Sequence, residues 1–225
     1  MSTPSNPSVF NTLPPIVLAL ATPMALLELG FWMGGRGFMD GLGWRLSALQ
    51  DQAFIPQIFW AMIQTGVWPL AEVSRFLTYP FLHYSPTHAI MAIVFLLALG
   101  KMVGEVLNAV AFLAVFFGSA VFGALIYALL STSQTVLVGG FPAVYGLIGS
   151  FTYMLYVRLG AIGAPQARAF SLIGFLLGIQ LLCALIFGGG QDWIADLAGF
   201  VAGFGISVLV CPGGFARLRA RLQRR

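Results

Sequence analysis

The chain has 225 residues, of which 59% are hydrophobic and only 8% are charged. About a quarter of the residues of a soluble domain are charged, so the charged side chains here are too few to cover a water-facing surface. The composition therefore excludes an ordinary soluble protein and predicts an all-α, polytopic membrane protein, long enough for six helices of roughly 20 residues and their connections.

The net charge of +4 comes mainly from the end of the chain. Five of the eleven Lys and Arg residues stand in the last nine positions: Arg217, Arg219, Arg221, Arg224 and Arg225. Such a cluster is typical of a tail at the cytoplasmic surface of a membrane. Nucleic acid is not an expected partner, because no basic fold accompanies the tail.

Residues 1–12 are polar and rich in Pro, Ser and Asn, which predicts a disordered start. The first span is expected over residues 15–33, with Pro15 in its first turn, where a missing N–H costs little. Glu28, near the end of this span, is one of very few acids within an apolar segment.

Residues 34–86 form a long connection that is too polar to span and too aromatic for a plain linker. Two short amphipathic helices are predicted over 53–63 and 69–77, lying in the membrane interface with Trp side chains as anchors. A connection of this length is usually functional.

Five further spans are predicted at about 87–103, 110–130, 141–157, 169–187 and 193–210. The membrane domain would then cover residues 13–212, and residues 213–225 would form the basic tail. Six spans put both termini on one side of the membrane. Eight basic residues would share that side, namely Lys101, Arg158, Arg168 and the five tail arginines, against Arg36, Arg45 and Arg75 on the other. This asymmetry predicts cytoplasmic termini, and the preference for Arg over Lys is associated with a bacterial source and hence an inner membrane.

Several local patterns between Trp44 and Gly203 occur in one order along the chain. They are Trp44-Arg45; Tyr79-Pro80-Phe81-Leu82-His83 with Thr87-His88; Gly100 to Glu105; Gly139 to Gly149; and Asp192 to Gly203. Together with six spans and a large first loop, they resemble the rhomboid family of intramembrane serine proteases. The resemblance implies a six-helix bundle with an interfacial first loop.

A working rhomboid site needs a serine hydroxyl on the fourth helix and a histidine on the sixth. Aligned on Gly139 and Tyr145, the nucleophile position of this chain holds Phe141, and the next position, a glycine in the family, holds Pro142. A phenyl ring has no attacking atom. The ring is expected to fill the space where substrate and water would enter.

The other polar positions have changed as well. The general-base position holds Asp196, and the position of the oxyanion-stabilising asparagine, four residues after His88, holds Ala92. Only His88 remains of the polar set. Losing the serine or the base alone costs serine hydrolases several orders of magnitude in rate.

Asp196 is unusual because a lone carboxylate within a span costs about 2.5–3.5 kcal/mol unless it is paired, protonated or hydrated. We expect it to hydrogen-bond Tyr145, a backbone group of the fourth helix or His88. A proton or cation site is the alternative, and Glu28 is its other candidate acid. His83 and His88 could ligate a metal by residue type, but a spacing of five on one helix would separate them, so no metal or cofactor is predicted.

Glycines are expected to pack the fourth helix against the sixth. Gly199 and Gly203 form a Gly-x-x-x-Gly pattern, which lets two helix backbones approach closely. Gly146 and Gly149 would supply the matching surface. Generic packing of small residues in a membrane bundle explains these glycines equally well, so they support the fold and not the function.

The resemblance implies a catalytically degenerate rhomboid that binds transmembrane segments of client proteins without cutting them, or serves as an accessory subunit of a larger membrane complex. The alternative is an intramembrane serine protease with a non-standard site. Its candidate hydroxyls, Ser119, Ser150 and Thr152, lie in spans, where hydroxyls usually bond back to the preceding turn. A small transporter is disfavoured because the chain lacks paired intramembrane charges and inverted repeats.

Overall fold

The computed structural model describes residues 13–37, 43–132, 135–187 and 190–211. These residues are almost entirely helical, and the extended pairing among them is a single antiparallel bridge between Phe54 and Leu137. The helices are α1 (Pro15–Gly35), α2 (Trp44–Gln52), α3 (Pro56–Thr65), α4 (Leu70–Thr78), α5 (Pro86–Gly104), α6 (Ala109–Leu130), α7 (Phe141–Ala161), α8 (Ser171–Phe187) and α9 (Trp193–Val210). Two short 3₁₀ segments, η1 (Tyr79–Phe81) and η2 (Gln166–Phe170), precede α5 and α8.

The helix ends carry the signals that local chemistry requires. A proline stands in the first turn of α1, α3, α5 and α7, where its missing N–H has no intrahelical partner to lose. The Ser85 hydroxyl and the Asn108 side-chain carbonyl accept hydrogen bonds from the backbone N–H of His88 and Ala111, capping α5 and α6.

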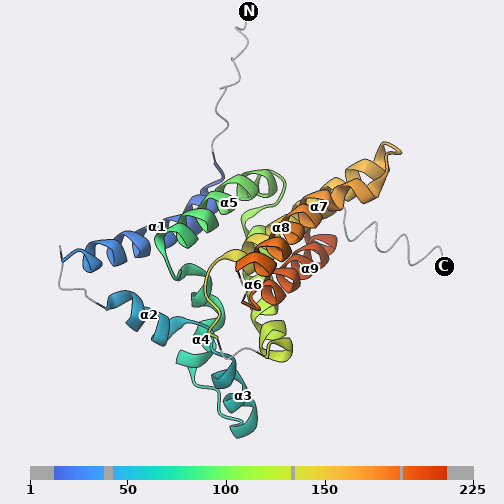
Figure 1. The fold of residues 1–225 in the computed structure, drawn as a ribbon. Coiled ribbons are helices and arrows are strands. Elements are labelled where there is room, and N and C mark those ends of the chain that lie inside the picture. Colours follow the sequence, from blue (N-terminus) through green and yellow to red (C-terminus); the bar gives the residue numbers. More distant parts are fainter. Residues whose placement is uncertain (1–12, 38–42, 133–134, 188–189, 212–225) are drawn as a thin grey trace, which may run out of the picture.

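Two groups of long helices make up the bundle (Figure 1). The helices α6, α7 and α9 pack closely on one another, and α1 lies along α5. Glycine permits the second contact, since a Cβ added to Gly100 of α5 would lie 2.8 Å from Val17 of α1. The largest fully buried side chains, among them Tyr79, Phe112 and Phe116, fill the interior between these groups.

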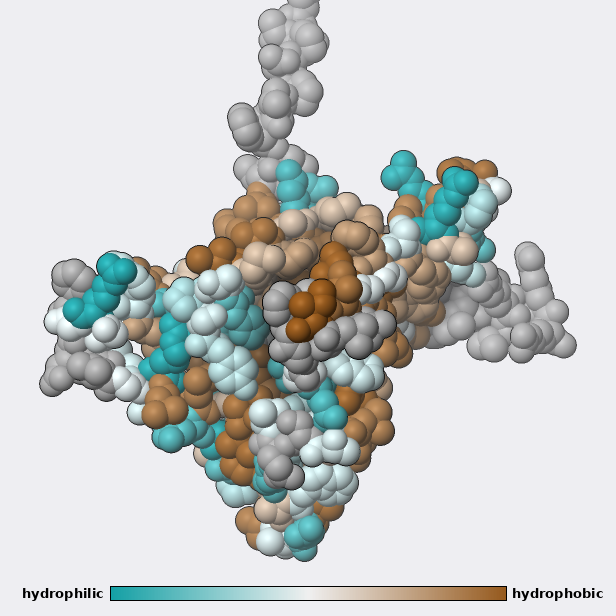
Figure 2. Space-filling view, in the orientation of Figure 1, coloured by the Kyte–Doolittle hydropathy of each residue, from teal (hydrophilic) through white to brown (hydrophobic). Residues whose placement is uncertain are grey.

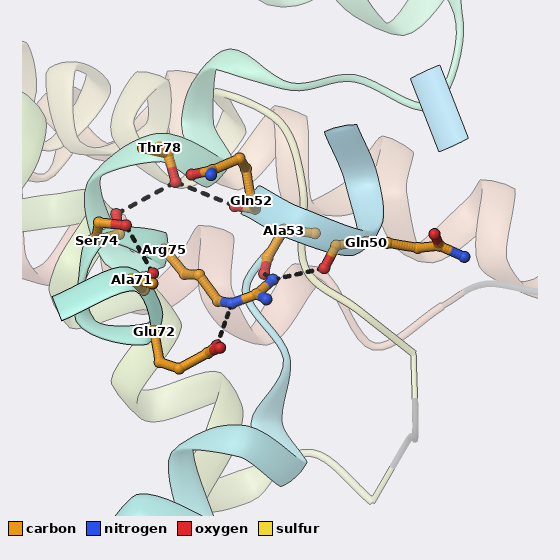
Figure 3. Close-up of polar contacts among 8 residues, drawn as sticks. All are labelled: Gln50, Gln52, Ala53, Ala71, Glu72, Ser74, Arg75 and Thr78. Carbon is orange, nitrogen blue, oxygen red and sulfur yellow. Dashed lines mark hydrogen bonds and ion pairs between the residues drawn. The ribbon is translucent and has the colours of Figure 1, made fainter. Parts of the chain in front are cut away.

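The first connection folds into α2, α3 and α4, which lie together on one side of the bundle (Figure 1). Arg75 of α4 reaches the end of α2, where its guanidinium donates to the carbonyl oxygens of Gln50 and Ala53 at 2.8 and 3.0 Å (Figure 3). Glu72 pairs with the same guanidinium. The Trp60 indole of α3 donates to the carbonyl of Ala128 in α6 at 3.0 Å, which ties this region to the bundle.

Four helices, α1, α5, α6 and α9, are long and apolar enough to cross a membrane by length and composition. The first half of α7 is buried and carries Gly, Ser, Thr and Tyr, so this helix needs less apolar surface. The 17 residues of α8 rise about 26 Å, close to the roughly 30 Å of a hydrocarbon core, and η2 extends them. These dimensions are consistent with the six predicted spans.

Apolar surface covers much of the bundle in Figure 2, while hydrophilic residues gather around the end of α1, around α2 and at the far end of α7. Large exposed side chains on the long helices are aliphatic or aromatic, such as Leu26, Ile90, Val110 and Phe175. This is the surface expected of helices that face lipid. The predictions for residues 1–12 and 213–225 lie outside the described residues.

Candidate functional site

The turn before α7 brings two segments distant in sequence together. Gly139 has a φ of +102° and donates its N–H to the Tyr79 carbonyl at 3.1 Å. A Cβ at this position would also lie 2.7 Å from the His88 ring. Both the backbone angle and the close approach therefore require glycine here.

Phe141 is the first residue of α7, and its ring contacts two side chains of α5. Its ring stacks on the imidazole of His88, with centroids 5.2 Å apart and planes 11° from parallel, and it lies edge-on to Phe95 at 6.4 Å. Ala92 is fully buried, and a Cβ built on Gly140 would lie 3.9 Å from its methyl group. The structure thus places the three predicted positions Phe141, His88 and Ala92 at one junction of α5 and α7.

His83 lies in the turn before α5 and contacts the same junction from that turn. It is 1% exposed, and its Nε2 atom accepts a long hydrogen bond from the Gly140 N–H at 3.4 Å. Burial, helped by the proximity of His88 and Arg45, lowers the pKa of His83 to about 3. The imidazole is therefore neutral at physiological pH, which its role as an acceptor requires.

The expectation that the two histidines stay apart was wrong. Their rings lie 5.1 Å apart and perpendicular. The reason is that His83 belongs to an irregular turn and only His88 to the helix, so helical spacing does not govern the pair. Among the described residues, no group of three or more His, Cys, Asp or Glu side chains is arranged to hold a metal ion.

Arg45, half of the Trp-Arg pair in the first connection, holds this turn from outside. Its guanidinium donates to both carboxylate oxygens of Glu28 and to the carbonyl of His83, at 2.5 to 3.0 Å. Glu28 thus forms an ion pair with Arg45 near the end of α1. The interaction links α1, α2 and the start of α5, and the spacing in the sequence gave no sign of it.

Asp196 is buried, with 5% of its surface exposed, but its partner differs from the predicted ones. The carboxyl Oδ2 atom accepts a hydrogen bond at 2.8 Å from the side-chain amide of Gln180 in α8. The predicted bond to Tyr145, an α7 backbone group or His88 is therefore wrong. Gln180 could have been singled out, because it is the one amide in an otherwise apolar predicted span, but periodicity did not show that it faces α9.

A small apolar cavity of about 30 Å³ lies beside Phe141, between α5, α7 and α8. It is lined by Phe95, Phe141, Val144, Tyr145, Ile148 and Leu176. Tyr145 thus faces the cavity between α5 and α8. The Phe141 ring occupies one wall of this cavity and separates it from His88.

Glycine contacts hold α7 against α9. A Cβ at Gly199 would collide with the Pro142 carbonyl, and one at Gly203 would collide with the Gly146 carbonyl. On the α7 side, Gly149 faces the backbone of Phe200, and Gly146 faces the Ser119 side chain of α6. At all four positions an added Cβ would lie closer than 3.0 Å to a neighbouring atom, so the contact depends on glycine.

The arrangement supplies no hydroxyl or thiol at the start of α7, where Phe141 presents only carbon atoms and Pro142 lacks an N–H. The two imidazoles lie on the α5 side of the Phe141 ring, and the buried carboxyl bonds to an amide of α8. These groups can support packing, hydrogen bonding and the binding of an apolar segment.

The family model of the Rhomboid domain matches residues 70–213. The chain is also 27% identical over 138 residues to "Rhomboid-like protease 1" of Toxoplasma gondii, a match that covers 61% of this chain and 47% of that protein. The chain therefore spans about half the length of this relative. The match to the domain family extends over more than half of the chain, from the start of α4 to beyond the end of α9, and the chain belongs to the rhomboid family.

Proposed function

We propose that this protein is a rhomboid-like membrane protein that binds transmembrane helices of partner proteins and does not hydrolyse them. The observation that carries the proposal is the Phe141 ring, which stacks on His88 at the start of α7, in the position where the family pattern has its serine. Hydrolysis of a peptide bond by the serine-protease mechanism needs an activated nucleophile, and the carbon atoms of a phenyl ring cannot serve as one.

The binding half of the proposal is supported by the surface beside this site. The apolar cavity lies between α5 and α8, and the outward face of α8 exposes Phe175, Ile179 and Leu182. A helix that approaches from the lipid would meet these side chains first. In a bilayer such contacts depend on packing and a few hydrogen bonds, so we expect affinities that are modest and sensitive to single residues.

A second candidate function is intramembrane serine proteolysis at a non-standard site. The relative from Toxoplasma gondii is named a protease. In this chain, Ser119, Ser150 and Thr152 are buried hydroxyls without a hydrogen-bond partner among the described residues. No imidazole bonds to any of them, and Ser119 packs against Gly146.

A fluorophosphonate probe on the purified protein separates the two functions. We expect no labelling of the folded protein under conditions in which an active rhomboid protease is fully labelled. Labelling that disappears in Ser119→Ala or Ser150→Ala would contradict the proposal and establish the protease.

We further propose that the protein lies in a bacterial inner membrane with both termini in the cytoplasm. The proposal is supported by the eight basic residues on the side of the C-terminal tail against three on the other. Alkaline phosphatase needs an oxidising compartment for its disulfides. Fused after Arg225 it should be inactive, whereas an active fusion would reverse the orientation.

A further inference from the structure

The side-chain amide of Gln180 has a hydrogen-bond partner for its nitrogen but none for its oxygen among the described residues. Its Nε2 atom donates to Asp196 at 2.8 Å, while its carbonyl oxygen is buried and has no hydrogen-bond partner among the described residues. A buried carbonyl without a donor costs free energy, and hydrocarbon offers no water to supply one. The pair therefore holds an acceptor without a donor inside the bundle.

The helix that carries Gln180 is held to the bundle on one side only. The first half of α8 packs against the core through Leu172, Ile173, Leu176 and Leu177. Its opposite face is exposed at Phe175, Ile179, Leu182 and Ile186. Between described residues, α8 makes few close backbone contacts with the other long helices. An outward displacement of α8 would therefore separate one apolar face from the core but break few close backbone contacts.

The apolar cavity is related to the Gln180–Asp196 pair through one face of α8. Leu176 lines the cavity and precedes Gln180 by four residues, so both side chains lie on one face of α8. Tyr145 and Ile148 of α7 form the facing wall. An apolar helix bound between α5 and α8 would contact Leu176 at the cavity. The Gln180 carbonyl would then lie about one turn of α8 away from that contact.

We propose that the Gln180–Asp196 pair is a polar recognition point for a bound transmembrane helix, and that it takes a hydrogen-bond-donating side chain such as Asn, Gln, Ser or Thr near the middle of that helix. This proposal rests on the proposed helix-binding function. The donor satisfies the Gln180 carbonyl, which no lipid tail can do. A partner with a wholly apolar span gains only packing.

Synthetic helices test the proposal. The probe is a Lys-flanked Leu/Ala transmembrane peptide with one central Asn, compared with its all-apolar parent, and its binding to the full chain in nanodiscs is followed by fluorescence energy transfer. Interhelical hydrogen bonds in membranes correspond to about three- to thirty-fold in affinity. We expect the Asn peptide to bind tighter by such a factor. A peptide with Asn moved six residues, about 9 Å along the helix, should lose the advantage.

Two variants locate the effect. The double variant Gln180→Met and Asp196→Leu removes the acceptors and should bind both peptides equally, whereas Ile179→Val, on the lipid-facing side of α8, should keep the preference. Equal binding of the Asn and apolar peptides to the wild-type protein would overturn the recognition point while leaving helix binding intact. Failure of both peptides to bind would overturn both proposals. The wild-type comparison decides even if the double variant does not fold.

Discussion

His83 is a buried imidazole held neutral by its surroundings. The unfolded chain takes up a proton at this residue below an ordinary pKa of about 6.5, but the folded protein does so only below a pKa of about 3. Between these values the unfolded state binds more protons, so the free energy of unfolding falls as pH falls. From pH 7 to pH 5 this group alone should remove about 2 kcal/mol.

The variant His83→Gln should show a shallower loss of stability over the same pH range, because an amide does not titrate. Unfolding in mixed micelles at pH 7, 6 and 5 measures the slope. Ser74→Ala, at a partly exposed position of α4, is the control and should follow the wild-type protein. Equal slopes for His83→Gln and the wild-type protein would refute the assignment.

Replacing the phenyl ring at the start of α7 should not restore catalysis. In Phe141→Ser, the introduced hydroxyl would lie on the side of His88 of α5, while the position of the family's base still holds Asp196 bonded to Gln180. We expect no labelling by a fluorophosphonate probe. We also expect a loss of roughly 2 kcal/mol in stability, as for partial loss of a buried aromatic side chain. Labelling of this variant would mean that His88 can act as a base.

The residues of the site were predictable where they belong to a local motif. Gly139, Phe141, Ala92 and His88 could be placed by alignment to the family pattern, and the structure brings them together. The partner of Asp196 could not be predicted, because nothing in the sequence fixes how α8 is rotated about its axis.

At the scale of elements, the contact of α7 with α9 depends on the absence of side chains. Gly203→Ala would drive a methyl group into the Gly146 carbonyl, a backbone group that cannot move away. Overpacking of this kind costs about 1–3 kcal/mol or more. Gly205→Ala, two residues on in the same helix, meets nothing within 4 Å. Thermal unfolding should separate the variants, and equal destabilisation would contradict the packing.

The end of α2 is stabilised by a residue more than twenty positions away. Arg75 is 8% exposed and bonds to the carbonyls of Gln50 and Ala53. Hydrogen bonds to charged groups contribute about 1.5–3 kcal/mol, so Arg75→Gln should destabilise α2 locally. Hydrogen exchange should become faster at residues 44–52 and stay unchanged in α7 and α9. Uniform exchange throughout the chain would show that α2 is not a separate unit.

This contact also explains why α2 was missing from the sequence-based prediction while α3, α4 and all the long helices were present. Five of its nine residues are polar, and the helix lacks a side-chain cap. A local sequence pattern predicts a helix when the residues that cap its ends and form its apolar face belong to the helix itself or directly flank it. A helix completed by Arg75 and Thr78 of a later element leaves no such pattern.

For the whole molecule, composition and span lengths predicted the architecture, because the bilayer limits a chain of this kind to a few solutions. The packing of α8 through one face only and the cavity beside it were not predictable, since both depend on how the helices pack. They are also the features on which the proposed binding of a helix depends.

Photocrosslinking in native membranes tests the central claim most directly. Benzoylphenylalanine at Phe175 on the exposed face of α8 should capture a membrane protein whose mass is that of the intact partner, and the same probe at Val201 of α9 should capture much less. A partner recovered as fragments cut within its span, or equal capture at the two positions, would contradict the account.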